Sequence, residues 1–289
     1  MKRVVTAAIL IPIVLVLVFL GPRAQWLFTL AVAIVAALAG WEYLGLTEHC
    51  GARPPRVATL VALLALFAVD FAWPDMTPAL FGMLGLALLV YCTFFKPVEE
   101  TIASASASIF CLMYTGVTLI ALPTLRELTN GPSLLLFLLC VVWAGDTAAY
   151  YVGRKWGRHK MAPTLSPGKS WEGAAASVAA GVLIAAILVG LATLMQAPWD
   201  SAFFTWLVRV CPSVILSYPD SLWYWMVLAV VVNIAGQVGD LAESALKRSA
   251  GVKDSGALLP GHGGVLDRID ALLLAAPVLW YIQAFHQRF

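Results

Sequence analysis

Long apolar runs without charged side chains constrain the fold of this 289-residue chain more than any other feature. Residues 4–20 and residues 174–195 are two such runs. A helix needs about 20 mostly apolar residues to cross a hydrocarbon core of roughly 30 Å. A backbone in lipid must satisfy its own hydrogen bonds, which favours helices, and the sequence does not show the short alternating segments of a β-barrel. We therefore expect an all-α polytopic membrane protein.

About nine transmembrane helices can be counted, and Gly and Pro residues mark most of the joints between them. The spans lie near residues 4–20, 24–46, 57–73, 78–95, 103–122, 134–152, 174–195, 222–245 and 267–285. We divide the chain into an N-terminal multi-span membrane region, 1–133, and a C-terminal membrane region with a polar site, 134–289. The aromatic-rich segment 196–221, which prolines interrupt, suits an interfacial helix.

The distribution of basic residues predicts the orientation, because Lys and Arg are retained on the cytoplasmic side of a membrane. With nine spans and a cytoplasmic N-terminus, 14 of the 18 Lys and Arg residues lie on the inside. The inside segments then include 153–172 and 247–267. We therefore expect an integral protein of the cytoplasmic (inner) membrane whose polar site faces the cytoplasm, where nucleotides are found.

The eighth span ends with a stripe of polar side chains. Asn233, Gln237, Asp240, Ser244 and Lys247 recur at steps of four and three, so they share one face of a helix. Ionisable groups inside a membrane are costly and usually mark a site or a pathway, so we assign Asp240 a functional role. For Asn233 and Gln237, interhelical hydrogen bonds that stabilise the bundle explain the pattern equally well.

The ninth span opens with the sequence DRID, which places Asp267 and Asp270 three residues apart at a helix start. Capping of the helix N-terminus by a carboxylate is one explanation. Asp240 and Asp267, however, end and begin helices that one short loop joins, so they can converge at the membrane boundary. Two carboxylates beside basic residues favour Mg²⁺, with phosphate oxygens as its remaining ligands. Zinc is not favoured, because His262 has no second His or Cys nearby.

Two loops carry basic residues near these carboxylates. The loop 251–266 contains five glycines and can turn backbone N–H groups toward a phosphate, although a flexible connector is the alternative. The loop 153–172 contains GKS, but the first glycine and the strand of a P-loop are missing. Its Lys169 and Ser170 stay candidates for phosphate binding. Positive-inside topology and anionic lipid explain its other basic residues, Arg154, Lys155, Arg158 and Lys160.

Residues 244–270, SALKRSAGVKDSGALLPGHGGVLDRID, closely resemble the signature of phosphatidate cytidylyltransferases, also called CDP-diacylglycerol synthases. The matching positions are Ser244, Lys247, Arg248, Lys253, Asp254, Gly256, Leu259, Pro260, His262, Gly263, Gly264, Asp267, Arg268 and Asp270. The segments WAGDTAAYYVGRKWGRHK, SPGKSWEG and GQVGDLAESALKR are also similar to this family. The resemblance covers the chain from about residue 140, whereas the N-terminal half matches only as an apolar multi-span region.

The resemblance implies that region 134–289 is catalytic and transfers the cytidylyl group of CTP to phosphatidate, with release of pyrophosphate and a requirement for Mg²⁺. It implies that Asp240 and Asp267 hold the metal ion. The triphosphate and the leaving pyrophosphate would be neutralised by Lys247, Arg248, Lys253 and Arg268. The predicted substrate-binding residues are Lys169, Ser170, Ser244, His262, Gly263, Gly264, Asp146 and Asp270. Asp146 is placed there by its position at the inner end of the sixth span, and a structural pairing with an Arg or Lys is its alternative. The implied partners are CTP, phosphatidate and membrane lipids, without nucleic acid; a second cation and a homodimer are left open.

Three rival functions can be weighed against these features. A CTP-dependent polyprenol kinase would use the same nucleotide, but the long signature disfavours it. A cation-coupled transporter would use the Asp240 stripe as an ion path. Transporters place their sites near the membrane midplane and show internal repeats, whereas the charges here gather on one face. A CDP-alcohol phosphotransferase carries a DGxxAR segment, which this sequence lacks.

Overall fold

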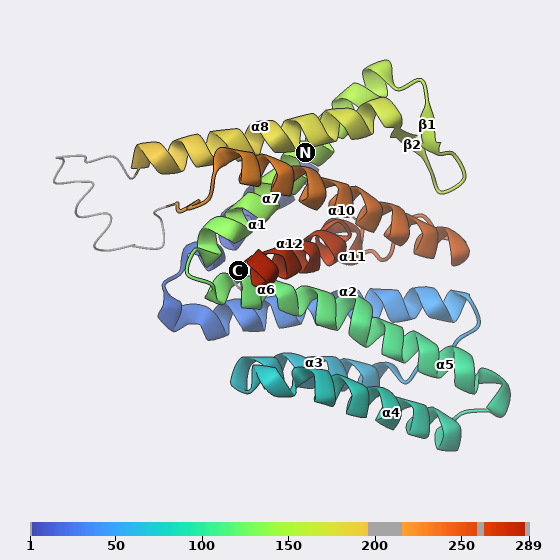
Figure 1. The fold of residues 1–289 in the computed structure, drawn as a ribbon. Coiled ribbons are helices and arrows are strands. Elements are labelled where there is room, and N and C mark those ends of the chain that lie inside the picture. Colours follow the sequence, from blue (N-terminus) through green and yellow to red (C-terminus); the bar gives the residue numbers. More distant parts are fainter. Residues whose placement is uncertain (1, 196–215, 259–262, 287–289) are drawn as a thin grey trace.

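The computed structural model describes residues 2–195, 216–258 and 263–286, which form one bundle of long helices (Figure 1). The helices are α1 (Lys2–Phe19), α2 (Gln25–His49), α3 (Arg56–Ala72), α4 (Thr77–Phe95), α5 (Val98–Cys111), α6 (Thr118–Glu127), α7 (Gly131–Trp156), α8 (Trp171–Met195), α10 (Leu222–Ser249), α11 (Leu266–Ile269) and α12 (Leu272–His286). A π-helical turn, Leu112–Val117, joins α5 to α6. Seven of the nine predicted spans therefore each coincide with one helix, whereas the fifth covers α5, the π-helical turn and α6, and the ninth covers α11 and α12. Most of the predicted interfacial segment 196–221 lies outside the described residues.

Seven helical stretches of the described chain are long and apolar enough to cross a membrane. They are Pro22–His49, Pro74–Phe95, Val98–Glu127, Gly131–Trp156, Trp171–Met195, Leu222–Ser249 and Leu266–His286. The other two predicted spans form α1, whose apolar part is Ala8–Phe19, and α3, which has 17 residues. The prediction of an all-α integral membrane protein is confirmed. The count of nine spans and the cytoplasmic N-terminus stay predictions.

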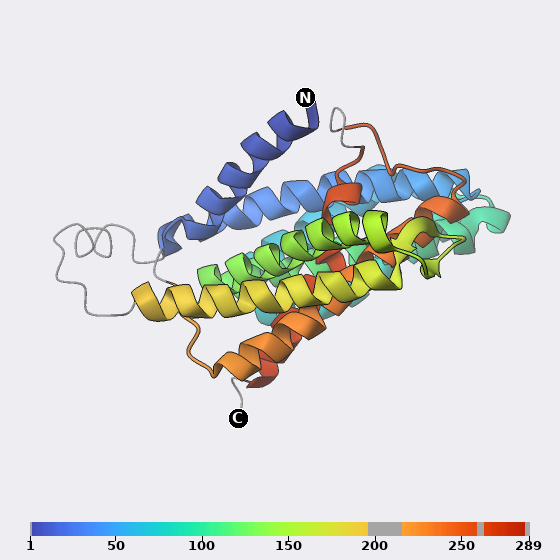
Figure 2. The same cartoon turned by 90° about the horizontal axis from the view of Figure 1, so that it is seen from above.

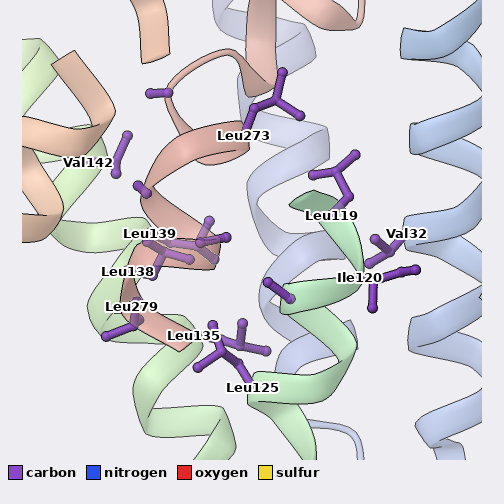
Figure 3. Packing of buried hydrophobic residues seen from close by; sticks show 14 of the residues in the cluster. Val32, Leu119, Ile120, Leu125, Leu135, Leu138, Leu139, Val142, Leu273 and Leu279 are labelled. Carbon is purple, nitrogen blue, oxygen red and sulfur yellow. The ribbon is translucent and has the colours of Figure 1, made fainter. Parts of the chain in front are cut away.

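The buried core joins helices from both halves of the chain. Figure 3 shows side chains from α6 and α7 meeting those of α12, with Val32 of α2 beside Ile120 of α6. Leu125, Leu135, Leu138 and Leu279 in this cluster have almost no exposed surface. Apolar side chains on the outside of the bundle remain exposed, as expected for a surface that faces lipid.

Small residues let α7, α8 and α10 pack closely around one polar contact. Asn233 of α10 accepts hydrogen bonds from the Ser177 hydroxyl of α8 at 3.1 Å and from the Gln237 amide at 2.7 Å. The Gln237 amide also lies within bonding distance, 3.3 Å, of the Ala174 carbonyl. A Cβ atom on Gly145 of α7 would overlap the Asn233 amide. Of the two explanations for Asn233 and Gln237, this geometry favours interhelical bonding.

A β-hairpin, which the sequence analysis treated as a loop, connects α7 to α8. Strand β1 (Lys160–Ala162) pairs antiparallel with β2 (Ser166–Ser170). Glu172, in the first turn of α8, fixes the hairpin because its carboxylate accepts the His159 backbone N–H at 3.1 Å and contacts the His159 ring at 2.7 Å. The hairpin lies at the same end of the bundle as the C-terminal ends of α2 and α10, on the right in Figures 1 and 2.

Candidate active site

Asp240 lies at this end of the bundle, on the face of α10 that is turned toward the hairpin. Its Oδ2 atom is 2.7 Å from the Nζ atom of Lys169, which the end of β2 provides. Its Oδ1 atom has a single long contact of 3.5 Å with the Ser244 hydroxyl, one helical turn further along. The Asp240 side chain is 35% exposed, so one of its oxygens is available to a ligand.

A cavity of about 560 Å³ opens beside this ion pair, between α7, the hairpin, α8 and α10. The polar residues that line it are Asp146, Tyr150, Arg154, Lys160, Lys169, Ser170, Ser177, Gln237 and Asp240. Arg154 donates to the Tyr150 hydroxyl at 3.1 Å. Two of the four basic residues that topology and lipid seemed to explain, Arg154 and Lys160, therefore line the same cavity as Asp240. Its cationic side chains suit an anionic ligand.

Asp267, at the start of α11, is held much more tightly than Asp240. Its Oδ1 atom is 2.5 Å from the Nζ atom of Lys247. Its Oδ2 atom accepts the backbone N–H groups of Gly264 at 2.8 Å and Ser255 at 3.0 Å, and lies 3.0 Å from the Ser255 hydroxyl. Only 6% of the Asp267 side chain is exposed. The carboxylate therefore closes the loop that precedes α11, and it makes no cap hydrogen bond to the N-terminus of that helix.

Lys247 bridges two buried carboxylates. Its Nζ atom lies 2.5 Å from Asp267 and 2.5 Å from Glu243, one turn earlier on α10. Glu243 has no exposed surface, so the ammonium group is the counter-charge that makes its burial tolerable. Asp240 pairs with Lys169 and Asp267 pairs with Lys247, so in the described chain no common cation joins the two aspartates.

Asp146 and Asp270 lie near Asp240. The charges of Asp146 on α7 and Asp270 are close enough to that of Asp240 to interact with it, and Arg268 lies near Asp146. Asp270 stands where α11 ends and α12 begins, and its carboxylate accepts the Ala271 backbone N–H at 2.7 Å. The predicted ninth span is therefore broken at Asp270 instead of being one helix from residue 267.

The remaining predicted residues have different positions. Arg248 donates to the Leu165 carbonyl in the hairpin turn at 3.2 Å and to the Val252 carbonyl at 2.9 Å, so it braces the hairpin against the loop. The buried Ser170 hydroxyl accepts the Gly173 N–H at 3.2 Å at the start of α8. Lys253 is exposed on the loop. The prediction for His262 lies outside the described residues.

Gly263 and Gly264 take their conformation from the groups around them. Gly263 has a φ of +81°, which lies in a backbone region that residues other than glycine rarely adopt. A Cβ atom on Gly263 would also stand 2.8 Å from the Asp267 carboxylate. A Cβ atom on Gly264 would overlap the Glu42 carboxylate, so both glycines let the backbone approach a carboxylate, and their role in substrate binding stays a prediction.

Glu42 was not among the site residues predicted from the sequence. It lies on α2, in the N-terminal region, yet its carboxylate accepts the backbone N–H groups of Val265 at 3.0 Å and Leu266 at 2.9 Å. A signal for it does exist in the sequence. Glu42 is the sole charged residue of the predicted span 24–46, and an intramembrane carboxylate usually has a function.

The described residues do not form a complete metal cage. No group of three or more His, Cys, Asp or Glu side chains among them is placed to hold a metal ion. Carboxylate oxygens are nevertheless the ligands that Mg²⁺ prefers, and Mg²⁺ commonly takes only one or two carboxylates beside substrate phosphates. Asp240, with one weakly bonded oxygen at the cavity, fits that pattern.

Comparison with known proteins extends the likeness over the whole chain. A family model described as the cytidylyltransferase family matches residues 1–286. A protein named phosphatidate cytidylyltransferase from Brucella suis biovar 1 (strain 1330) is 34% identical over 292 residues, covering 98% of this chain and 92% of the relative. A protein of the same name from Haemophilus influenzae is 30% identical, covering 98% of each chain. This chain belongs to the cytidylyltransferase family.

Proposed function

We propose that this protein transfers the cytidylyl group of CTP to phosphatidate, giving CDP-diacylglycerol and pyrophosphate. The observation that carries the proposal is the cationic cavity beside Asp240, which opens at one end of a bundle of membrane-spanning helices. One substrate is a lipid and the other a soluble nucleotide, so a polar site at the membrane boundary can receive both. Family membership and the name of the relatives support the same reaction.

The chemistry needs little from the protein beyond position and charge. A phosphate oxygen of phosphatidate forms a bond to the α-phosphorus of CTP, and the bond to the bridging oxygen of the β-phosphate breaks. The electron pair of that bond leaves with pyrophosphate. The attacking phosphate is already anionic, so no strong general base is required. Catalysis then comes from orientation of the two phosphates and neutralisation of their charges.

The cationic side chains fall into two groups that suit these tasks. Lys169, Arg154 and Lys160 line the cavity and can meet a phosphate there. The second group, near the loop after α10, comprises Lys247, Arg248, Lys253 and Arg268, which we assign mainly to the triphosphate. Lys253 is exposed, whereas Lys247 and Arg248 already hold protein groups.

Mg²⁺, when bound, would supply positive charge that stabilises the phosphate groups, and Asp240 and Asp267 would hold it. Asp240 would offer the oxygen that has only the 3.5 Å contact with Ser244. Asp267, the second proposed ligand, would offer Oδ1 once Lys247 turns from it to a substrate phosphate. Asp146 and Asp270 would add negative charge near Asp240 without direct contact with the reacting atoms.

The setting of the site is also part of the proposal. We place the protein in the cytoplasmic (inner) membrane with its N-terminus and the cavity facing the cytoplasm. A cysteine-accessibility scan should label 153–172 and 247–267 from the cytoplasm and 196–221 from the opposite side. Labelling of Lys253→Cys only from outside would contradict this orientation. The mass of the protein in detergent would decide whether a homodimer forms.

Incorporation of CTP into lipid by purified protein tests the reaction directly. With CTP labelled in the cytidine, phosphatidate in mixed micelles and Mg²⁺, we expect label in the lipid fraction and release of pyrophosphate. Replacing Mg²⁺ by EDTA should stop both. Transfer of the γ-phosphate of CTP to a polyprenol, with no cytidine in lipid, would instead support the kinase alternative. Asp75→Asn, at an exposed acidic residue before α4, serves as a control variant.

A further inference from the structure

Glu42 connects the N-terminal region to the loop that carries Asp267. Its Oε1 atom accepts the Val265 N–H at 3.0 Å, and its Oε2 atom accepts the Leu266 N–H at 2.9 Å. Oε2 also lies 3.0 Å from the Ser255 hydroxyl. The residue is 5% exposed, so these contacts, which are charge-assisted, replace water around the carboxylate.

The loop is shaped to fit around this carboxylate. A Cβ atom on Gly256 would overlap Oε1 of Glu42, and a Cβ atom on Gly264 would overlap Oε2. These two glycines lie on either side of the Glu42 carboxylate, and each leaves the space that the carboxylate fills. Side chains at either position would push the loop away from α2. The two glycines of the loop therefore leave room for the side chain of Glu42, which lies more than 200 residues earlier in the chain.

Glu42 and Asp267 share the same short piece of backbone. The N–H of Gly264 goes to Asp267, and the next two N–H groups, of Val265 and Leu266, go to Glu42. The Ser255 hydroxyl lies 3.0 Å from a carboxylate oxygen of each. Displacement of Glu42 would therefore shift Asp267 and, through it, the Lys247 ammonium group.

We propose that Glu42 is a positioning residue for the transfer reaction, which fixes the described ends of the loop after α10, at Ser255 and at residues 264–266, so that Asp267 and Lys247 stand at the catalytic site. The proposal rests on the proposed function. Glu42 touches no substrate itself. It acts through the N–H groups of Val265 and Leu266 and the hydroxyl of Ser255.

Glu42→Gln tests this role, because an amide keeps the size of the side chain but turns an NH₂ group toward N–H donors. We expect kcat to fall about a hundredfold, as for a displacement of catalytic groups by about 1 Å. The KM for phosphatidate should change much less. Glu48→Gln is the matched control: Glu48 lies on the same helix, is exposed, and pairs with Arg56 at 2.6 Å.

Hydrogen exchange of the unliganded protein supplies a second readout that does not depend on activity. In Glu42→Gln the amides of Val265 and Leu266 should exchange faster, while those of α7 and α8 stay protected. Glu48→Gln should leave both unchanged. Ser255→Ala, a milder variant that keeps Glu42, should lower kcat about two- to tenfold, as for loss of one hydrogen bond. It therefore decides the matter if Glu42→Gln does not fold.

The outcomes separate this proposal from the proposed function. Faster exchange at Val265 and Leu266 with normal kcat in Glu42→Gln would mean that Glu42 only stabilises the fold, and the positioning role would be wrong. Unchanged exchange would show that Glu42 does not anchor the loop. If Glu42→Gln does not fold, a normal kcat in Ser255→Ala would overturn the proposal. Wild-type protein that incorporates no cytidine into lipid would refute the proposed function, while the exchange measurement would still report on the anchor.

Discussion

Two regions of the candidate site carry an aspartate beside a lysine, yet they are built differently. Around Asp240 the carboxylate lines a cavity, is 35% exposed and has one close partner, Lys169. Around Asp267 the carboxylate is 6% exposed and receives Lys247, two backbone N–H groups and a hydroxyl contact. The first region has room for a ligand. The second region has its hydrogen-bonding capacity filled by the protein.

The difference shows that two aspartates with the same proposed role differ in how readily they can reach a ligand. Asp240 can meet a ligand without any rearrangement of its neighbours. Asp267 can do so only if Lys247 moves, and such a move would leave Glu243 without its counter-charge. We expect substitutions at Asp240 to affect turnover alone, and substitutions around Asp267 to affect both turnover and stability.

The largest expected effect comes from removing either carboxylate charge. Asp240→Asn and Asp267→Asn should each reduce turnover of CTP to background, since the amide keeps the shape but loses the charge of a proposed Mg²⁺ ligand. Both variants should still insert and purify. Rates of cytidine incorporation at saturating Mg²⁺ measure the effect. A near-normal kcat in one variant would remove that aspartate from the proposed metal site.

The second largest expected effect is a difference between the two regions in the free energy of unfolding. Lys247→Met leaves Glu243 and Asp267 without their counter-charge in a closed environment, which typically costs about 3–5 kcal/mol. In Lys169→Met, water can solvate the partly exposed Asp240 carboxylate. The loss in free energy of unfolding should therefore stay below about 1 kcal/mol. Unfolding of both variants in the same detergent measures the free energies. Equal losses would mean that the two regions are not distinct.

Substitution of Lys253, an exposed cation of the loop, should affect the kinetics of one substrate more than those of the other. Lys253→Ala removes a charged contact that we assign to the triphosphate, worth roughly 1.5–3 kcal/mol, or about ten- to a hundredfold in kcat/KM for CTP. The KM for phosphatidate should move much less. Steady-state kinetics in mixed micelles, varying each substrate at saturation of the other, measures this. A large phosphatidate defect with a normal CTP response would reverse the assignment.

The smallest effects should come from the end of α7. Arg154 lines the cavity and donates to Tyr150, so Arg154→Ala should lower kcat/KM about two- to tenfold. Lys155 lies over the Trp156 ring, 4.9 Å from its centroid, and outside the cavity lining, so Lys155→Ala should change kcat/KM less than twofold. Equal effects of the two substitutions on kcat/KM would support the topological role that the sequence predicts for both residues.

The helices were predictable because their signal is local. Charge-free runs and Gly–Pro joints locate them, and the depth of Asp240 in the eighth span indicates a site. The hairpin was not predictable, because its strands have three and five residues and include Pro167 and Gly168. The break at Asp270 was missed since a side chain that takes up the Ala271 N–H looks, in sequence, like an ordinary helix start.

The partners of the site residues could not be found from local pattern. Glu42 meets Ser255 across 213 residues, and Arg248 meets Leu165 across 83. Such pairings depend on how helices pack, which periodicity does not encode. The sequence also could not distinguish Asp240 from Asp267, because exposure follows from the surrounding loop and cavity. What it did provide was the set of candidates.

The close contact of α7, α8 and α10 has a consequence for motion. Gly145 faces Asn233 with no space for a Cβ atom, and a Cβ atom on Gly181 would make tight contacts with Val141 and Asn233. These helices therefore cannot slide without breaking the hydrogen bonds of Asn233. Densely packed elements open rarely, whereas short strands and glycine-rich loops open at low free energy. We expect microsecond-to-millisecond opening to be confined, among the described elements around the cavity, to the hairpin. Entry and exit of a ligand at the cavity would then depend on movement of the hairpin, while the three helices beside it stay in place.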